Sequence, residues 1–582
     1  MDLALLFSAK DVAPFLQCGN GKNGIKIFAT GLDTIQELKK RKLNFHFFHH
    51  YLEYSDLIKN YKSANKLAGF THPYFFNSAR LFFLELARSH QVMAKLIDKY
   101  QPEKIYVADD VSHQIFIKYL PQTYNLIPKV LVELCPKRKI RLEIFRTNNR
   151  KQSLLLMFLF SLLTKIKLSF SGHPVPQFSN SHPNLILAAS DYHLANLDSF
   201  IKRASQKWNL IILGKSPKTS SWPSKVVHLN QKYRLGFVKT ISNALKTIIF
   251  WKKDCQIQFH RLRPEIVKIL NEDYANLIIK QLRYWNLVLK FEGEFLWHYF
   301  SLLFSLQKPI ALLSSNSLDN HNRILHLVSK KYHVQDFVVL HYPLLCLLDA
   351  IEEQAGVESN LFVSGEKSRQ LLNERFFNSR IFVTGLPAYD HYSTDKFLPP
   401  AAINQPVKIL FLLSQSGLYF QDPIDIAIYQ ILEELDKLAD KLKIEVTLRP
   451  HPGQKLNIIE SKKRFYPIKI DNQIKLKSQL VKNHIVIAHT TSAVIDAMIM
   501  KKPLIYFNTF ETKNYSPFAI DGAALGVYRT HQLIHSIRSL IEHPNQLVKN
   551  QQKFLKIYCS NIIGKSSKRI IRSIESLCKV KN

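Results

Sequence analysis

Several residue types are scarce in this sequence, and each shortage narrows what the protein can be. Only six cysteines occur in 582 residues, and they are scattered without a CxxC pair. That pattern argues against a disulfide framework or a zinc site and favours reduced thiols in a cytosolic compartment. The 17 glycines form no Arg/Gly tract, and no RNP signature, zinc finger or helix-turn-helix pair accompanies them, which argues against nucleic acid as a partner.

Long hydrophobic runs are also missing from the sequence. No uninterrupted apolar run approaches the roughly 20 residues that a membrane span requires. The first fifteen residues contain Asp2 and Asp11 and no basic leader, so we expect no signal peptide. Together with the cysteine pattern, these features predict a cytoplasmic protein.

Acidic residues are few compared with basic ones. The chain has 45 Asp and Glu against 80 Lys and Arg, a formal net charge of +35. A field of that size suits an anionic partner, either phosphorylated substrates or an anionic membrane surface. The competing explanation is a general bias of composition towards lysine.

Residues 484–508 are the most informative part of what is present. They indicate a strand, a hydroxyl-rich turn, a helix, a Lys-Pro pair and a second strand. Thr490, Thr491 and Ser492 would lie at the helix start, where free N–H groups and partial positive charge attract phosphate. Asp496 lies one turn further in and can accept hydrogen bonds from a ribose diol. The alternative is an ordinary βαβ unit with a Thr/Ser cap.

Three earlier strands also end in chemistry suited to a ligand. One ends at Arg449 and His451, which can hold a diphosphate through a bidentate guanidinium and an imidazole donor. Another ends at Ser414, Ser416 and Gly417, which offer hydroxyls and a place for close backbone approach. A third ends in Gly-Leu-Pro at 385–387. Ligands of open α/β sheets bind at the carboxyl ends of strands, although each of these segments can also be a plain surface turn.

The order of these motifs resembles a known family. G-E-K-S (365–368), V-T-G-L-P-x-Y-D (383–390), L-R-P-H-P (448–452) and H-T-T-S-A-V-I-D-A (489–497), followed by K-K-P-L-I (501–505), resemble the donor-binding domain of GT-B glycosyltransferases. The nearest groups are bacterial capsule and surface-polysaccharide transferases and CDP-glycerol glycerophosphotransferases. The resemblance covers about residues 360–540.

The resemblance implies an α/β, GT-B-like fold, with two Rossmann-like domains facing across a cleft and an additional N-terminal α/β unit. We expect the following division of the chain: an N-terminal Rossmann-like unit (1–150), a basic and apolar connecting segment (151–183), an acceptor-side domain (184–345), a nucleotide-sugar donor-binding domain (346–545) and a C-terminal basic helix (546–582). Such tails often cross back onto the preceding domain in this fold.

The implied activity is transfer of a sugar from a UDP-, CMP- or CDP-linked donor to a saccharide or lipid-linked acceptor of the cell surface, with neither cofactor nor metal. The CDP-glycerol alternative is weakened because no WHG-type motif appears at Leu340–Pro343. A UDP-sugar 2-epimerase-like enzyme and a non-catalytic polysaccharide assembly or export protein remain as alternatives. The leaving diphosphate would be stabilised by Arg449 and by hydroxyls, which is electrostatic preorganisation.

Transfer to a hydroxyl also needs a group that accepts its proton. Asp191 and His193 follow the first predicted strand of the acceptor-side domain and are our leading candidates. Weaker candidates follow other strands, namely Asp109, Asp110, His113 and His341.

Residues 137–167 combine a basic run with the apolar stretch Leu154–Leu163. That stretch is too short to cross a bilayer, and its basic flanks suit an interfacial helix on an anionic membrane. We therefore expect a protein bound peripherally to the inner face of the membrane. The alternative is a core helix after a basic loop.

Overall fold

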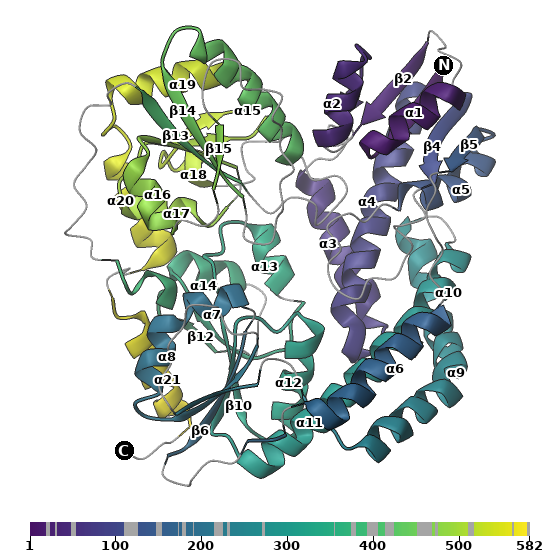
Figure 1. Cartoon of the computed structure of the whole chain (residues 1–582), viewed down its shortest axis with the longest axis vertical. Coiled ribbons are helices and arrows are strands. Elements are labelled where there is room, and N and C mark those ends of the chain that lie inside the picture. The colour runs from purple at the N-terminus through teal and green to yellow at the C-terminus, as the bar shows by residue number, and fades with distance from the viewer. Residues whose placement is uncertain are drawn as a thin grey trace.

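The computed structural model describes 1–18, 24–29, 32–47, 54–109, 126–146, 154–172, 174–176, 182–189, 191–214, 225–229, 233–270, 274–353, 355–373, 380–392, 406–413, 424–450, 468–471, 475–489, 491–509, 517–560 and 564–578. These residues form three parallel sheets with helices around each (Figure 1). The predicted α/β class is therefore confirmed.

The N-terminal sheet has the order β3-β2-β1-β4-β5. Its strands are β1 (Asp2–Leu6), β2 (Ile25–Ala29), β3 (His46–Phe47), β4 (Lys104–Asp109) and β5 (Arg141–Arg146). Helices α1 (Ala9–Cys18), α2 (Leu32–Lys40) and α5 (Ile127–Lys137) accompany them. β1 is central because its run Leu3–Leu6 is fully buried and pairs with β2 on one side and β4 on the other. The predicted Rossmann-like unit is present.

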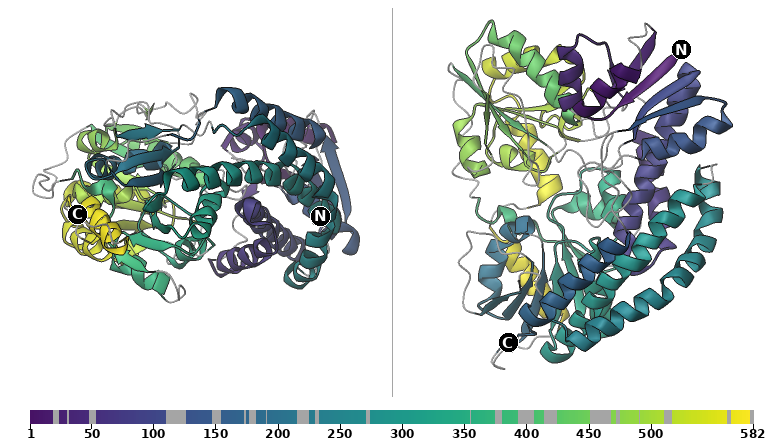
Figure 2. Two further views of the ribbon diagram at one scale, coloured as in Figure 1. Left: turned by 90° about the horizontal axis from the view of Figure 1, so that it is seen from below. Right: turned by 45° about the vertical axis from the view of Figure 1, so that its right-hand side comes forward.

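A layer of long helices extends from this unit (Figures 1 and 2). It comprises α3 (Tyr54–Gly69), α4 (Phe76–Tyr100), α6 (Leu154–Ser171), α9 (Phe237–Leu270), α10 (Ala275–Tyr284) and α11 (Lys290–Gln307). A π-helical turn, Trp285–Leu289, joins α10 to α11. Trp285 is fully buried there, with its ring stacked on Phe75 at a centroid distance of 5.6 Å and edge-on to Phe82 at 5.5 Å.

This packing corrects two predicted domain boundaries. The segment 151–183 is not a separate connector, because α6 packs into the same hydrophobic core as the N-terminal sheet through Phe158. The same core includes Leu262 of α9 and Leu282 of α10. Helices assigned from sequence to the acceptor-side domain therefore share their core with the N-terminal unit.

The middle domain has a seven-stranded sheet of order β12-β11-β10-β9-β6-β7-β8. Its strands are β6 (Asn184–Ala188), β7 (Asn209–Leu213), β8 (Val226–His228), β9 (Ala311–Ser314), β10 (Gln335–Val339), β11 (Asn360–Val363) and β12 (Ile381–Val383). The boundary predicted at residue 346 is wrong, because β11 pairs with β10 and β12 pairs with β11. The motifs at 365–368 and 383–390 therefore belong to the middle domain.

The C-terminal domain has a six-stranded sheet of order β15-β14-β13-β16-β17-β18. Its strands are β13 (Val407–Leu412), β14 (Ile444–Arg449), β15 (Ile468–Ile470), β16 (Ile485–Ala488), β17 (Leu504–Phe507) and β18 (Leu525–Val527). Helices α15 (Ile424–Ala439), α16 (Leu476–Lys482), α17 (Val494–Ile499), α19 (Gln532–Glu542) and α20 (Val548–Cys559) surround it. The central strands β13, β16 and β17 are almost entirely buried, as their continuous apolar sequences predict.

The tail after residue 546 forms two helices rather than the one predicted. Helix α20 packs in the C-terminal core, whereas α21 (Ser566–Leu577) packs on the middle sheet through Ile570, Ile571 and Ile574. The chain turns between them at Gly564, whose φ of +59° favours glycine. The predicted return of the tail onto the preceding domain is confirmed for α21.

Asp390 fixes the start of α21. Its two carboxylate oxygens accept hydrogen bonds from the backbone N–H groups of Ser566 and Ser567, each at 2.9 Å. One turn later, Arg569 donates to the carbonyl oxygen of Thr384 at 2.6 Å. A Cβ on Gly385 would lie 2.6 Å from the hydroxyl of Ser566, so the glycine is needed where the segment after β12 meets α21.

We predict that Asp390→Ala destabilises the attachment of α21. The substitution leaves two backbone donors at a helix start without their charged acceptor, a loss of roughly 2 kcal/mol. Hydrogen exchange over residues 566–577 should accelerate more than exchange in β13. Asp440→Asn, at an exposed position, is the matched control. Unchanged exchange in α21 of the Asp390→Ala protein would contradict the role given to this carboxylate.

Candidate functional site

Three polar side chains gather at the carboxyl edge of the middle sheet. His193 follows β6 in the short helix α7 (Asp191–Asn196), Ser315 follows β9, and His341 follows β10. The Nδ1 atom of His193 lies 2.9 Å from Oγ of Ser315. The rings of His193 and His341 lie close together, with centroids 3.8 Å apart and planes tilted by 31°. The structure therefore joins a leading candidate base with one of the weaker ones.

Tyr342, the residue after His341, contacts a buried acidic group. Tyr342 donates a hydrogen bond to Glu353, the last residue of α13 (Leu347–Glu353), at 3.1 Å. Burial raises the pKa of Glu353 to about 8, helped by the neighbouring charge of Glu352. Glu352 itself forms an ion pair with Arg80 of α4 at 3.0 Å. Glu353 therefore retains its proton at neutral pH, while Tyr342, its hydrogen-bond partner, has its ring edge-on to that of His341.

The C-terminal sheet contributes a cation and a carboxylate to its own carboxyl edge. Arg449 is the last residue of β14 and donates from Nη1 to Oε1 of Gln479 in α16 at 2.6 Å. Asp496 of α17 accepts a hydrogen bond from the hydroxyl of Tyr392 at 2.6 Å. Burial raises the pKa of Asp496 to about 6, while the Tyr392 hydroxyl and the positive charge of Arg449 oppose that rise. Arg449 and Asp496, singled out separately from the sequence, are thus electrostatic neighbours.

Tyr392 links this group to the middle domain. It is buried and lies two residues beyond Asp390, the residue that holds α21. Lys477 of α16 lies over its ring, with Nζ 5.2 Å from the centroid. The segment that leaves the middle domain after β12 therefore ends against α16 and α17 of the C-terminal domain.

The hydroxyl-rich turn differs in detail from its prediction. Helix α17 begins at Val494, so Thr491 and Ser492 lie in the turn before it. Oγ1 of Thr491 accepts a bond from the backbone N–H of Ala493 at 3.4 Å. His489 is buried, and burial lowers its pKa to about 4, so this imidazole is neutral at physiological pH.

Several predicted site residues lie outside the described part of the chain. They are Ser414, Ser416, Gly417, His451 and Thr490, together with the side chain of Asp191. Of the weaker candidates for the base, Asp110, His113 and the side chain of Asp109 also lie outside it. Their roles remain predictions.

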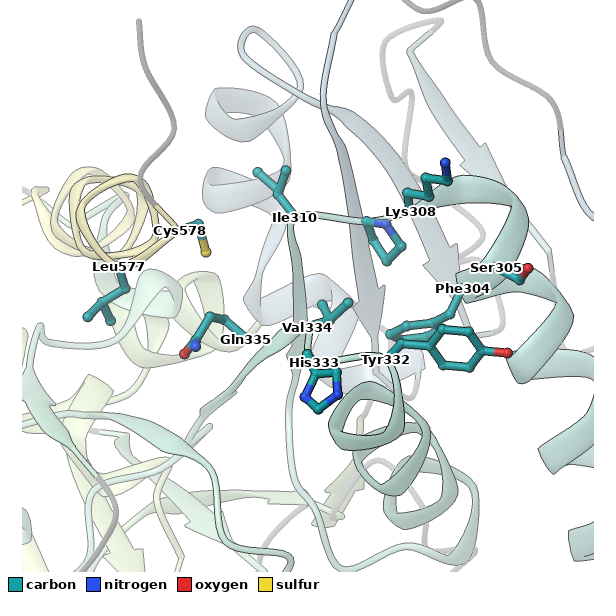
Figure 3. Close-up of a pocket in the computed structure, with 11 residues that line it drawn as sticks. Phe304, Ser305, Lys308, Ile310, Tyr332, His333, Val334, Gln335, Leu577 and Cys578 are labelled. Atoms are coloured by element: carbon teal, nitrogen blue, oxygen red, sulfur yellow. The ribbon is translucent and has the colours of Figure 1, made fainter.

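One open cavity of about 610 Å³ lies away from these groups (Figure 3). It is lined by residues before β9 and β10, such as Pro309 and Val334, and by Leu577 and Cys578 at the end of α21. It therefore lies at the amino edge of the middle sheet, opposite the edge where ligands of such sheets bind. Among the described residues, no group of three or more His, Cys, Asp and Glu is arranged to hold a metal ion.

No protein-family model and no curated protein matches the chain. Similar solved structures include S. aureus MnaA with UDP (14% identity, TM-score 0.42, covering 69% of this chain and 98% of that one). The UDP-GlcNAc 2-epimerase of Neisseria meningitidis bound to UDP-GlcNAc has 13% identity and a TM-score of 0.41, covering 68% of this chain and 100% of that one. The wall teichoic acid polymerase TagF soaked with CDPG has 11% identity and a TM-score of 0.41, covering 73% of this chain and 97% of that one. At 11–14% identity and TM-scores of 0.41–0.42, these similarities assign neither a family nor an activity to this chain.

Sequence reasoning missed Ser315, Tyr392, Gln479 and Glu353. Ser315 had a usable signal, because Ser314–Ser317 is a polar run directly after an apolar strand, like the turn at 489–492. Tyr392, Gln479 and Glu353 had none, because their positions depend on how separate elements pack together.

We predict that Glu353→Gln changes how stability depends on pH. The wild-type folded state holds a proton up to about pH 8, whereas the unfolded chain releases it near 4.5. Glu353 therefore makes the wild type lose stability as pH rises from 4.5 to 8, by at most about 1.4 kcal/mol per pH unit, and the amide variant lacks this contribution. Denaturation at a series of pH values should show that the free energy of unfolding of the variant rises relative to that of wild type as pH increases across this window. Glu358→Gln, at an exposed position, is the control; a pH-independent difference for Glu353→Gln would contradict the assignment.

Proposed function

We propose that the protein is a glycosyltransferase that moves a sugar from a nucleotide-activated donor to a saccharide or lipid-linked acceptor of the cell surface. One observation carries the proposal. The Tyr392–Asp496 hydrogen bond joins the end of the middle domain, with its histidine pair, to the part of the C-terminal domain that holds Arg449. A candidate base for the acceptor hydroxyl and a candidate ligand for the leaving diphosphate thus lie in two domains that this hydrogen bond connects.

The proposed chemistry assigns a role to each side. The acceptor hydroxyl attacks the anomeric carbon of the donor sugar, the bond from that carbon to the diphosphate oxygen breaks, and the nucleoside diphosphate leaves. His193 takes the hydroxyl proton on one ring nitrogen while Ser315 orients the ring through the other, a pairing that supports general-base catalysis. Asp191, at the start of the same helix, is the alternative base.

Arg449 stabilises the departing diphosphate in this scheme. A guanidinium offers two parallel donors to phosphate oxygens, and its charge gains value as the leaving group becomes more negative. Ser414, Ser416, Gly417, His451 and Thr490–Ser492 are proposed to surround the same diphosphate. Asp496 is proposed to bind the ribose, with Tyr392 holding its carboxylate in place.

A 2-epimerase-like reaction on a UDP-sugar is the second candidate. The close approach of the His193 and His341 imidazoles and the raised pKa of Glu353 favour it, because epimerisation needs proton-transfer groups around one sugar and no acceptor. Incubation with a panel of UDP-, CMP- and CDP-linked sugars, with and without saccharide or lipid-linked acceptors, separates the two. Acceptor-dependent release of nucleoside diphosphate supports transfer, whereas an isomerised nucleotide sugar formed without acceptor supports epimerisation. Failure to bind any nucleotide in calorimetry would exclude both transfer and epimerisation.

We predict that Arg449→Ala slows transfer by about 30- to 1000-fold, equivalent to a loss of roughly 2–4 kcal/mol of transition-state stabilisation. Arg449→Lys should recover part of the rate, because it restores the charge without the bidentate geometry. Arg529→Ala, at an exposed position of the same domain, is the control. Steady-state kinetics on folded protein provide the measurement, and a rate within threefold of wild type for Arg449→Ala would refute the role.

We further predict that Asp496→Asn weakens nucleotide binding by about 1–3 kcal/mol, the range for hydrogen bonds to a charged group. Tyr392→Phe is the matched variant, because it deletes only the hydroxyl that donates to Asp496. If the carboxylate binds the ribose, calorimetry should show a larger loss for Asp496→Asn than for Tyr392→Phe. Equal losses would mean that Asp496 only holds the two domains together.

A further inference from the structure

Helix α6 presents an apolar face to solvent. Leu155, Leu156, Leu159, Phe160 and Leu163 are all exposed, and Phe160 reaches 72%. The apolar stretch predicted from the sequence is therefore neither a buried core segment nor covered by another part of the described chain. By length and composition, the 18-residue α6 is also the one described helix that is apolar enough to span a membrane.

Helix α9 adds a second apolar stripe next to the first. Its exposed residues include Phe237, Val238, Leu245, Ile249 and Phe250, with Val238 at 81% and Ile249 at 68%. Helices α6 and α9 run side by side along the outer edge of the helical layer (Figures 1 and 2). We call the exposed apolar residues of these two helices the α6–α9 face. Nothing in the local sequence of α9 had indicated this role.

Specific contacts hold the two helices in this arrangement. The hydroxyls of Ser169 and Thr240 lie 3.1 Å apart, and the rings of Phe170 and Phe237 lie 5.8 Å apart at the same end of the pair. On its other side, α6 donates a hydrogen bond from Ser161 to Glu292 of α11 at 2.6 Å. These contacts leave the apolar residues of the α6–α9 face exposed to solvent, while other apolar residues, such as Phe158 of α6 and Leu262 of α9, lie in the core.

The charged residues of α6 and of the first half of α9 have one sign. Helix α6 has no acidic residue, and neither has the first half of α9, residues 237–253. The exposed cations are Lys167, Lys239, Lys246, Lys252 and Lys253. The two carboxylates further along α9 are engaged by lysines of neighbouring helices: Asp254 pairs with Lys290 at 2.5 Å and Glu265 with Lys66 at 2.6 Å.

We propose that the α6–α9 face docks on an anionic lipid bilayer, with its apolar side chains in the interface and its lysines among the headgroups. Lysines beside an apolar stripe match the chemistry of such a surface. A second copy of this chain fits less well, because a symmetric contact would bring the two sets of lysines together. A spanning α6 would have to break the Ser161–Glu292 and Ser169–Thr240 contacts, whereas an interfacial α6 keeps them.

Cosedimentation of the full chain with vesicles tests this proposal without any assay of activity. One set of vesicles is phosphatidylcholine alone, and the other contains phosphatidylglycerol. We expect binding to the anionic vesicles, little binding to the neutral ones, and weakening by added salt through screening. Two variants remove exposed apolar side chains, one from each helix. The α6 variant combines Leu156→Gln, Phe160→Gln and Leu163→Gln. The α9 variant combines Leu245→Gln and Ile249→Gln.

Each variant should bind the anionic vesicles roughly tenfold or more weakly than wild type. The control combines Val481→Gln with Ile520→Gln, two apolar residues of the C-terminal domain that are 62% and 55% exposed, and should bind like wild type. We expect unchanged thermal unfolding for all variants, since the substituted side chains are exposed. That result excludes a folding defect as the cause of weaker binding.

Three outcomes would overturn the proposal. Equal, salt-independent recovery with both vesicle types would exclude electrostatic docking. Self-association of wild type in sedimentation velocity, lost in the α6 and α9 variants, would assign the face to a second copy of the chain. Membrane-bound protein that resists extraction by alkaline carbonate would make α6 a transmembrane span.

Discussion

The carboxylate of Asp390 is the contact on which the arrangement of the middle and C-terminal domains depends. Through the N–H groups of Ser566 and Ser567 it holds the start of α21, and α21 then covers one face of the middle sheet. Two residues after Asp390, Tyr392 reaches Asp496. One short segment therefore secures both the returning helix and the side of the C-terminal domain proposed to bind the donor. A substitution here would disturb stability and ligand geometry together.

Several strands were predictable from the sequence, but the sheets to which they belong were not. Short β-branched runs such as Ile485–Ala488 and Ile444–Arg449 are strands because such residues suit a buried parallel sheet. The strands at 360–363 and 381–383 look the same locally, yet they pair with β10 rather than with the C-terminal sheet. Pairing partners are chosen by tertiary packing, which no local pattern records. The same reason explains why α9 and α10 joined the N-terminal core through residues such as Leu262 and Leu282.

The candidate site was predictable only as far as strand ends allow. Arg449 and His193 were singled out because polar residues at the end of an apolar strand lie at the ligand edge of a parallel sheet, and Asp496 because it lies one turn beyond a hydroxyl-rich turn. The partners that give them a chemical setting come from distant elements: Gln479 for Arg449, Tyr392 for Asp496 and Ser315 for His193. The α6–α9 face shows the same limit, since the basic and apolar composition near α6 indicated a membrane but gave no sign of its neighbour.

The position of α21 in the chain has a consequence for synthesis on the ribosome. The middle sheet contains β6 and β7, made early, yet Ile570, Ile571 and Ile574 cover one of its faces. Helix α8 (Asp198–Ala204) packs on the same face, and the part beneath α21 stays exposed until the C-terminal domain has been translated and α21 emerges. Nascent chains therefore expose apolar surface for a long interval. Multidomain proteins depend on chaperones in this circumstance.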